Sequence, residues 1–226
     1  MTTSFLDFLK KQDCLVIAPS IDKTAYCSLD LSHNNPDLKE VNVSKSDDLE
    51  RFVNSEIKKK NAQVAYGGYL EKRNIYQRSS YFKAESDLKN ERNIHLGIDI
   101  WAAEGTSVQA ALAGTIHSYK NNLNHGDYGP TIILEHDLEG FKFYTLYGHL
   151  SKSSIKNISI GQSVEKAEQI ATLGSAEVNG DYPPHLHFQL IINLENKRGD
   201  YPGVCSENEL EFYKTNCPDP SLILGL

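Results

Sequence analysis

The sequence has few cysteines, no long apolar run and no excess of positive charge. Its 226 residues include four cysteines without a CxxC pair, too few for a disulfide framework in a chain of this size, so we expect free thiols. No stretch approaches the ~18 consecutive apolar residues that cross a bilayer. With 30 acidic against 23 basic residues, the net charge of -7 gives a nucleic-acid partner no electrostatic support. Charged residues also interrupt the apolar positions of MTTSFLDFLKK before a signal peptide could form, which predicts a cytoplasmic location, with signal-independent export left open.

The apolar pattern divides the chain into an N-terminal region (residues 1–93), a core (94–200) and a tail rich in turn residues that packs on the core (201–226). The clearest N-terminal element is one amphipathic helix that begins at Ser46, with acids in its first turn, an apolar stripe and lysines in its last turn. About ninety residues precede the first candidate ligand, which is enough chain to cover an active site. Whether this region covers a cleft, and which protein partners the chain has, are left open by the sequence.

From residue 94 the chain changes to short runs that alternate apolar and polar residues between glycine-centred turns. Such spacing is typical of an antiparallel β core, either a sandwich or an open barrel. With the mixed N-terminal region, the expected class is mainly β and α+β overall. The expected strands are 94–100, 107–110, 114–119, 131–136, 141–150, 165–173 and 185–192.

Five polar residues in these strands are not explained by core packing: His95, Asp99, His149, His185 and His187. In a strand, alternate residues share one face, so both histidines of HLH point the same way while the leucine between them faces the core. By the same alternation, His95 and Asp99 share a face, with a glycine between them that leaves room for an ion or a substrate to approach.

Two imidazoles and one carboxylate form a recurrent catalytic zinc set, because three protein ligands leave a fourth position for water. Zinc lowers the pKa of that water to about 7. Three ligands drawn from four candidates leave at least one histidine for acid–base chemistry, and His149 supplies another. The same ligand types occur in iron enzymes of the oxygenase class, but the four-residue spacing of the carboxylate and the two spare histidines favour zinc.

At this point the sequence resembles a known family, the lysostaphin-like, LytM-type zinc endopeptidases that cut peptidoglycan. The resemblance covers residues 94 to 192 through HLGIDI, GTSVQAALAGTIHSY, DYGPTIILEH, FYTLYGHLS, GQSVEKAEQIATLG and PPHLHFQL. It implies one zinc ion held by His95, Asp99 and His187, and two catalytic histidines, His149 and His185. The longer pieces YGGYLEKRNIYQRSSYF, NGDYPPHLHFQL, DYPGVC and CPDPSLILGL resemble a narrower branch, the peptidase-like domains fused to class III aminotransferases.

The activity that this resemblance implies is zinc-dependent hydrolysis of a peptide amide, in peptidoglycan or in a related peptide containing glycine or D-amino acids. Tyr147, two residues before His149 in the expected strand, could add an oxyanion donor, and Arg78 could hold a substrate carboxylate. Two alternatives stay open at this stage. One is a non-catalytic LytM-like module that binds the cell wall or a partner protein, and the other is a zinc hydrolase of a small non-peptidoglycan amide.

Overall fold

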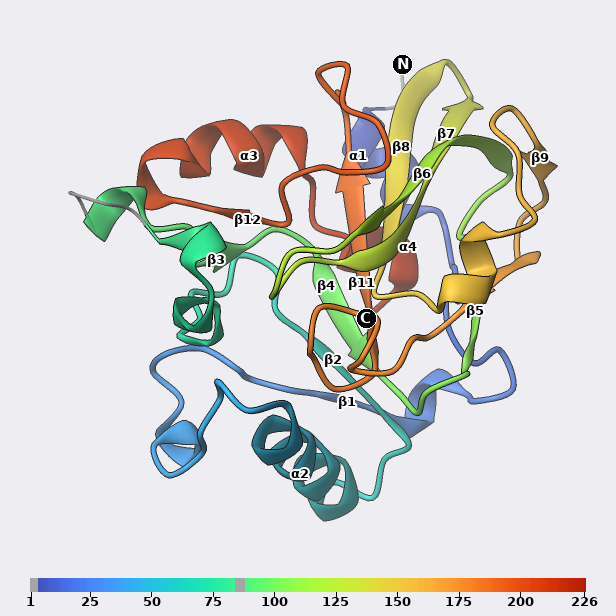
Figure 1. Ribbon diagram of the computed structural model, residues 1–226. Helices are drawn as coiled ribbons and strands as arrows, with labels where there is room; N and C mark the ends of the chain where they lie inside the picture. Colours follow the sequence, from blue (N-terminus) through green and yellow to red (C-terminus); the bar gives the residue numbers. More distant parts are fainter. Residues whose placement is uncertain (1–3, 84–87) are drawn as a thin grey trace.

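The computed structural model in Figure 1 describes residues 4–83 and 88–226, and a sheet of eight strands is its central feature. All neighbouring strands are antiparallel except the first pair, β1 and β2. The expected mainly β fold with an antiparallel core is therefore confirmed. In spatial order the strands are β1 (Tyr26–Ser28), β2 (Val64–Gly67), β4 (Ile98–Trp101), β11 (His185–Ile191), β8 (Phe141–Gly148), β7 (Gly129–Leu138), β6 (Gly114–Asn122) and β9 (Ser163–Val164).

Two smaller antiparallel sheets complete the β structure. They pair β5 (Ser107–Gln109) with β10 (Gln169–Thr172), and β3 (Ile94–His95) with β12 (Val204–Cys205). The strand expected over 94–100 is thus interrupted at Gly97. A Cβ at Gly97 would lie 2.7 Å from the His187 ring. The space beside this glycine is therefore filled by that imidazole and not, as expected, by an ion or a substrate.

The N-terminal region contributes strands to the main sheet as well as a helix. Strand β2 pairs with β4 so that Gly67 lies opposite Asp99. The sequence pattern did not predict β1 and β2, which are three and four residues long. The expected amphipathic helix is present as α2 (Ser46–Lys59), beside β1 and β2 in Figure 1.

The remaining helices are short. The C-terminal tail forms one strand of a small sheet and two helices, α3 (Leu210–Asn216) and α4 (Ser221–Leu224), while α1 (Phe5–Lys10) lies near the N-terminus. No helix in the described part of the chain is long and apolar enough to cross a membrane. The 3-10 helices are η1 (Lys23–Ala25), η2 (Pro36–Leu38), η3 (Ile75–Arg78), η4 (Ser80–Phe82), η5 (Leu88–Asn90), η6 (Lys152–Ile155) and η7 (Glu207–Glu209).

The two faces of the main sheet have different roles. On β11, Leu186, Phe188 and Leu190 belong to the largest apolar cluster, to which α1 and α4 also contribute side chains. The alternate residues of the same strand, His185 and His187, point to the opposite face because strand side chains alternate. That second face carries the polar site, with apolar clusters on either side of it.

Candidate metal centre

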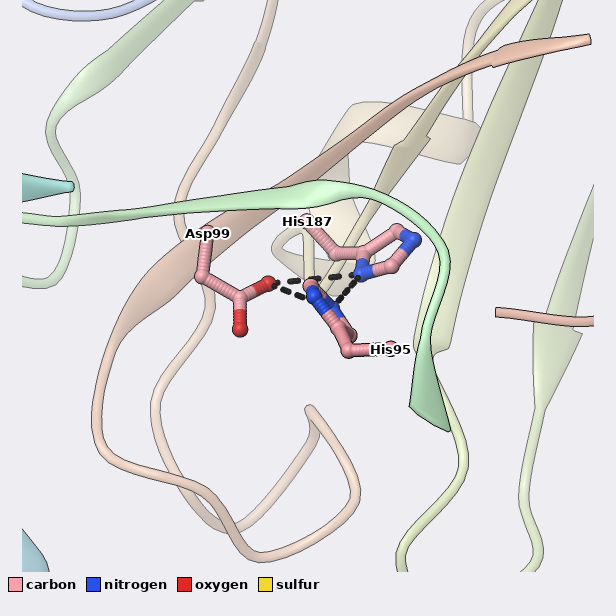
Figure 2. A group of neighbouring side chains, drawn as sticks. All are labelled: His95, Asp99 and His187. Atoms are coloured by element: carbon pink, nitrogen blue, oxygen red, sulfur yellow. Dashed lines mark hydrogen bonds and ion pairs between the residues drawn. The ribbon is translucent and has the colours of Figure 1, made fainter. Parts of the chain in front are cut away.

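Three candidate ligands meet on the polar face of the sheet. His187 lies directly opposite Asp99 in the β11–β4 pairing, and His95 ends β3, the strand that precedes β4 in the chain and pairs with β12. His95 Nε2 is 2.8 Å from His187 Nδ1, and these two nitrogens are 3.2 and 3.3 Å from Asp99 Oδ1. Figure 2 shows the three side chains pointing toward one another. All three are buried.

The outer nitrogen of each ligand imidazole donates a hydrogen bond, which fixes the tautomer. His95 Nδ1–H donates to the carbonyl of Gly68 at 3.0 Å. Gln189 donates its amide N–H to the Pro202 carbonyl at 3.1 Å, so its Oε1 faces His187 and accepts from Nε2–H at 2.9 Å. Such outer partners orient metal-binding imidazoles and raise their basicity.

These tautomers leave unshared electron pairs converging on one point. The inner nitrogens of His95 and His187 face each other without a proton, and Asp99 Oδ1 has no hydrogen-bond partner among the described residues. Buried acceptors without a donor are costly. A divalent cation would satisfy all three atoms, which lie within 4.8 Å of one another. The three residues therefore fit a metal ion with two nitrogen ligands and one oxygen ligand.

His149 and His185 form a second pair beside this cluster. Their ring centroids are 4.2 Å apart, and His185 Nε2 lies 3.8 Å from Asp99 Oδ1. His185 Nδ1–H donates to Pro183 O at 2.8 Å, and His149 Nδ1–H donates to Asn179 O at 2.7 Å. Each ring therefore keeps Nε2 unprotonated when it is neutral. Trp101 stacks on His185 with centroids 4.2 Å apart and holds its orientation.

Burial sets the charge state of the site before any ion binds. It lowers the pKa of both His95 and His185 to about 4. The pKa of His149 is held well below its usual range, first by burial and then by the neighbouring imidazoles. Burial alone would raise the pKa of Asp99, but the His95 imidazole and the Arg73 guanidinium outweigh it and hold that pKa well below its usual range. At neutral pH these three imidazoles are thus neutral and the carboxylate is ionised, as metal ligands and general bases require.

A cleft of about 340 Å³ opens over the site, and all five predicted polar residues line it. Aromatic side chains wall it, among them Trp101, Tyr128 and Tyr182. The N-terminal region supplies part of one wall through Ile75 and Phe82. Residues 200–204 supply another part of the wall.

The two predicted substrate-binding residues do not line this cleft. Tyr147 is fully buried in the main apolar cluster, and its hydroxyl accepts from the backbone N–H of Ala111 at 2.9 Å. It does not share a face with His149, because His149 follows the end of β8 with a left-handed φ of 62° that breaks the strand alternation. The expected oxyanion donor is therefore absent from this position.

Arg78 is likewise not among the residues that line the cleft. Its guanidinium donates to the carbonyls of Gly180 and Asp181 at 2.8 and 2.6 Å, and it lies 4.3 Å above the ring of Tyr182. Its Nη2 supports the loop that carries Tyr182, a wall of the cleft, while Nε and Nη1 are buried without a hydrogen-bond partner among the described residues.

The sequence analysis did not assign a role to two residues at the site. Arg73 donates from Nη1 to Asp99 Oδ2 at 2.5 Å. The Tyr128 ring lies over His187 with centroids 5.0 Å apart, and its hydroxyl donates to the Tyr201 carbonyl at 3.0 Å. Arg73 lies in YGGYLEKR, which resembles the narrower branch, and Tyr128 lies in DYGP, which resembles the family, but neither segment has a pattern that indicates contact with the site.

The three ligand residues fit a metal centre, and comparison with known proteins relates the part of the chain that carries them to one family. Residues 93–198 match the model of peptidase family M23, so the chain carries an M23 peptidase domain of the LytM and lysostaphin type. The expected resemblance is thereby confirmed; the comparisons do not address fusion to aminotransferase domains.

Three curated relatives are similar over this domain. An uncharacterized metalloprotease of Haemophilus influenzae is 37% identical over 99 residues, which is 44% of this chain and 19% of the relative. The uncharacterized lipoprotein YgeR of Escherichia coli is 36% identical over 42% of this chain and 33% of its own length. The DD-carboxypeptidase/endopeptidase Mpg of Neisseria meningitidis is 35% identical over 44% of this chain and 20% of its own. The matched segment thus spans a third or less of these relatives.

Among solved structures, the catalytic domain of lysostaphin from Staphylococcus simulans matches 73% of this chain and 97% of its own, with 24% identity and a TM-score of 0.41. The catalytic domain of the EnpA protein of Enterococcus faecalis matches 64% of this chain and 89% of its own, with 17% identity and a TM-score of 0.42.

Proposed function

We propose that this chain is a zinc-dependent metallopeptidase that hydrolyses an amide bond in peptidoglycan or in a related peptide containing glycine or D-amino acids. The observation that supports the proposal best is the completeness of the site. Three buried ligand atoms converge without a proton between them, and two further histidines offer Nε2 in the same cleft. The M23 domain and the Neisseria meningitidis relative named as a DD-carboxypeptidase/endopeptidase support the reaction class.

His95, Asp99 and His187 would hold the ion. Zinc bound there would act as a Lewis acid, lowering the pKa of a water and polarising the scissile carbonyl. His185 and His149 are neutral at physiological pH, so either Nε2 can accept a proton from the attacking water. The imidazolium formed can then return that proton to the leaving amine, or donate a hydrogen bond to the developing oxyanion.

The hydrogen bonds from Nδ1 of the two histidines to backbone carbonyls restrict these roles to the other ring nitrogen, Nε2. Because His149 Nδ1–H and His185 Nδ1–H are each bound to a backbone carbonyl, the rings cannot rotate freely and proton exchange is confined to Nε2.

A mass-spectrometric digest tests this proposal. Zinc-loaded protein, with and without chelator, is incubated with purified muropeptides, with glycine- and D-alanine-containing peptides, and with small amides. We expect chelator-sensitive cleavage of a peptide in this panel. Cleavage of small amides alone would replace the peptide substrate with the alternative of a small-amide hydrolase. Zinc-loaded protein that cleaves nothing in the panel would count against an enzyme and favour a binding module.

Variants separate metal binding from catalysis. We expect His187→Ala to lose both zinc and activity, whereas His149→Ala keeps one zinc ion and loses activity. The matched control is His117→Ala, because His117 is a partly exposed histidine on β6 that does not line the cleft. A His149→Ala protein with parental activity would refute the role given to His149.

A further inference from the structure

Residues 70–73, which precede the segment that matches family M23, form backbone hydrogen bonds with the segment that carries His95. The backbone N–H of His95 donates to the carbonyl of Glu71 at 3.0 Å, and the His95 carbonyl accepts from Leu70 at 2.9 Å. Two residues further on, the N–H of Arg73 donates to the Asn93 carbonyl at 2.9 Å. These bonds hold residues 70–73 against the ligand-bearing segment and bring the Arg73 side chain to Asp99.

Arg73 is a buried cation with two carboxylate partners. Its side chain is 4% exposed, and it forms ion pairs with Asp99 and Glu71. Glu71 is itself fixed, because its second oxygen accepts from the backbone N–H of Leu31 at 3.0 Å. Arg73 also lines the cleft, so this charge network reaches the site from the N-terminal region.

Gly68 provides the space that this arrangement needs. It has a left-handed φ of +106°, and a Cβ there would lie 1.9 Å from Arg73 Nη2 and 2.9 Å from His95 Nδ1. Its carbonyl is the acceptor that fixes the His95 ring. Only glycine adopts this conformation readily and also leaves the guanidinium in place.

We propose that Arg73 is a positioning residue of the metal centre, which occupies Asp99 Oδ2 and leaves this carboxylate a single oxygen, Oδ1, to offer an ion. The inference rests on the proposed function to the extent that the site must hold a divalent metal. A carboxylate without such a partner can bind through both oxygens. A catalytic site must keep one coordination position open, so a second oxygen from Asp99 would compete for the position that the reaction needs.

The test compares Arg73→Met with the parent protein by metal binding, spectroscopy and kinetics. Methionine keeps an unbranched, though shorter, side chain without the charge or the donors. The control is Arg51→Met on α2, where the arginine is exposed and pairs with Asp48. Each protein is loaded with Co²⁺, its visible absorption spectrum is recorded, zinc affinity is measured by chelator competition, and kcat and KM are determined on a cleaved peptide.

We expect Arg73→Met to retain one metal ion while its Co²⁺ absorption weakens, as happens when coordination rises from four to five. We expect kcat to fall by about 10- to 100-fold, the usual cost of losing an outer-shell partner, with little change in KM. Arg51→Met should match the parent in every measurement. An Arg73→Met protein with the parental Co²⁺ spectrum and kcat would overturn the proposal.

A second variant covers the case in which Arg73→Met fails to fold. Arg73→Gln also removes the charge and the Nη1 donor to Asp99 Oδ2 but keeps a polar side chain, and we expect a spectral change in the same direction. A parental spectrum for Arg73→Gln when Arg73→Met cannot be folded would overturn the proposal. A parent protein that binds Co²⁺ but cleaves nothing would refute the peptidase function alone, since the spectra still decide the role of Arg73. A parent that binds no metal would refute both.

Discussion

Acidification should destabilise the protein in part through His136, a fully buried histidine on β7. Its Nδ1–H donates to the Ala113 carbonyl at 2.9 Å, and its Nε2 accepts from the Thr145 hydroxyl at 2.8 Å. Its ring stacks on Phe143 with centroids 4.9 Å apart. Both ring nitrogens are therefore satisfied in the neutral form, and a proton added at Nε2 would force the Thr145 hydroxyl to turn from donor to acceptor.

The size of the effect follows from the pKa. Burial lowers the pKa of His136 from 6.5 to about 4. Between these two values the unfolded chain binds a proton that the folded chain does not, so stability present above pH 6.5 is lost as the pH falls. Between about pH 7.5 and about pH 5, only the ~1.5 pH units below the unfolded pKa of 6.5 contribute. The free energy of unfolding therefore falls by about 2 kcal/mol, at 1.36 kcal/mol per unit.

Urea unfolding of the parent and of His136→Leu at both pH values measures this contribution. With chelator present, the other buried histidines titrate alike in the two proteins, and their effects cancel in the comparison. We expect the variant to be less stable at pH 7.5 because it lacks both hydrogen bonds, yet to lose about 2 kcal/mol less on acidification. Equal losses in the two proteins would refute the assignment of His136 as a buried neutral group.

Two further predictions concern the partners of β8 and β11. Gln189→Leu removes the acceptor of His187 Nε2–H, and we expect about 10- to 100-fold weaker zinc binding by chelator competition; Gln189→Glu, which keeps an acceptor, should retain most of the affinity, and equal losses in both would contradict this role. Tyr147→Phe leaves the buried N–H of Ala111 without its acceptor, so we expect a loss of about 1–3 kcal/mol in urea unfolding with kcat unchanged. A large fall in kcat with normal stability would restore the expected role of Tyr147 as an oxyanion donor.

The strand alternation made most of the site predictable. In HLHFQL the apolar residues occupy every second position, so the two histidines must share the other face wherever the strand lies in the sheet. The same reasoning holds for Asp99 on β4, whose apolar neighbours Ile98 and Ile100 face the core. These predictions depend on local pattern alone, which the tertiary structure preserves.

The parts that the sequence could not predict depend on contacts between distant segments. The alternation predicts a shared face for Tyr147 and His149, because nothing in YGHL indicates the positive φ that ends the alternation. Strands β1 and β2 are too short for a periodic signal, and they are stabilised by pairing with each other and with β4. Arg73 reaches Asp99 because residues 70–73 form backbone hydrogen bonds with residues 93–95. The sequence around Arg73 does not indicate this pairing.

The ordering of strands also bears on self-association. Exposed strand edges are templates for aggregation, and proteins protect them with short or covered edge strands. The main sheet ends in β1, of three residues, and β9, of two, and the carbonyl of Ser28 on β1 accepts from the Lys60 ammonium. Beyond β9, the outer side of β6 is covered where Arg198 donates to the His117 carbonyl and Gly199 to the Ser118 hydroxyl. At the described edges of the main sheet little unpaired backbone is therefore offered to a second copy. The segment that leads into one wall of the cleft, residues 198 and 199, also protects the long strand β6 from edge-to-edge pairing.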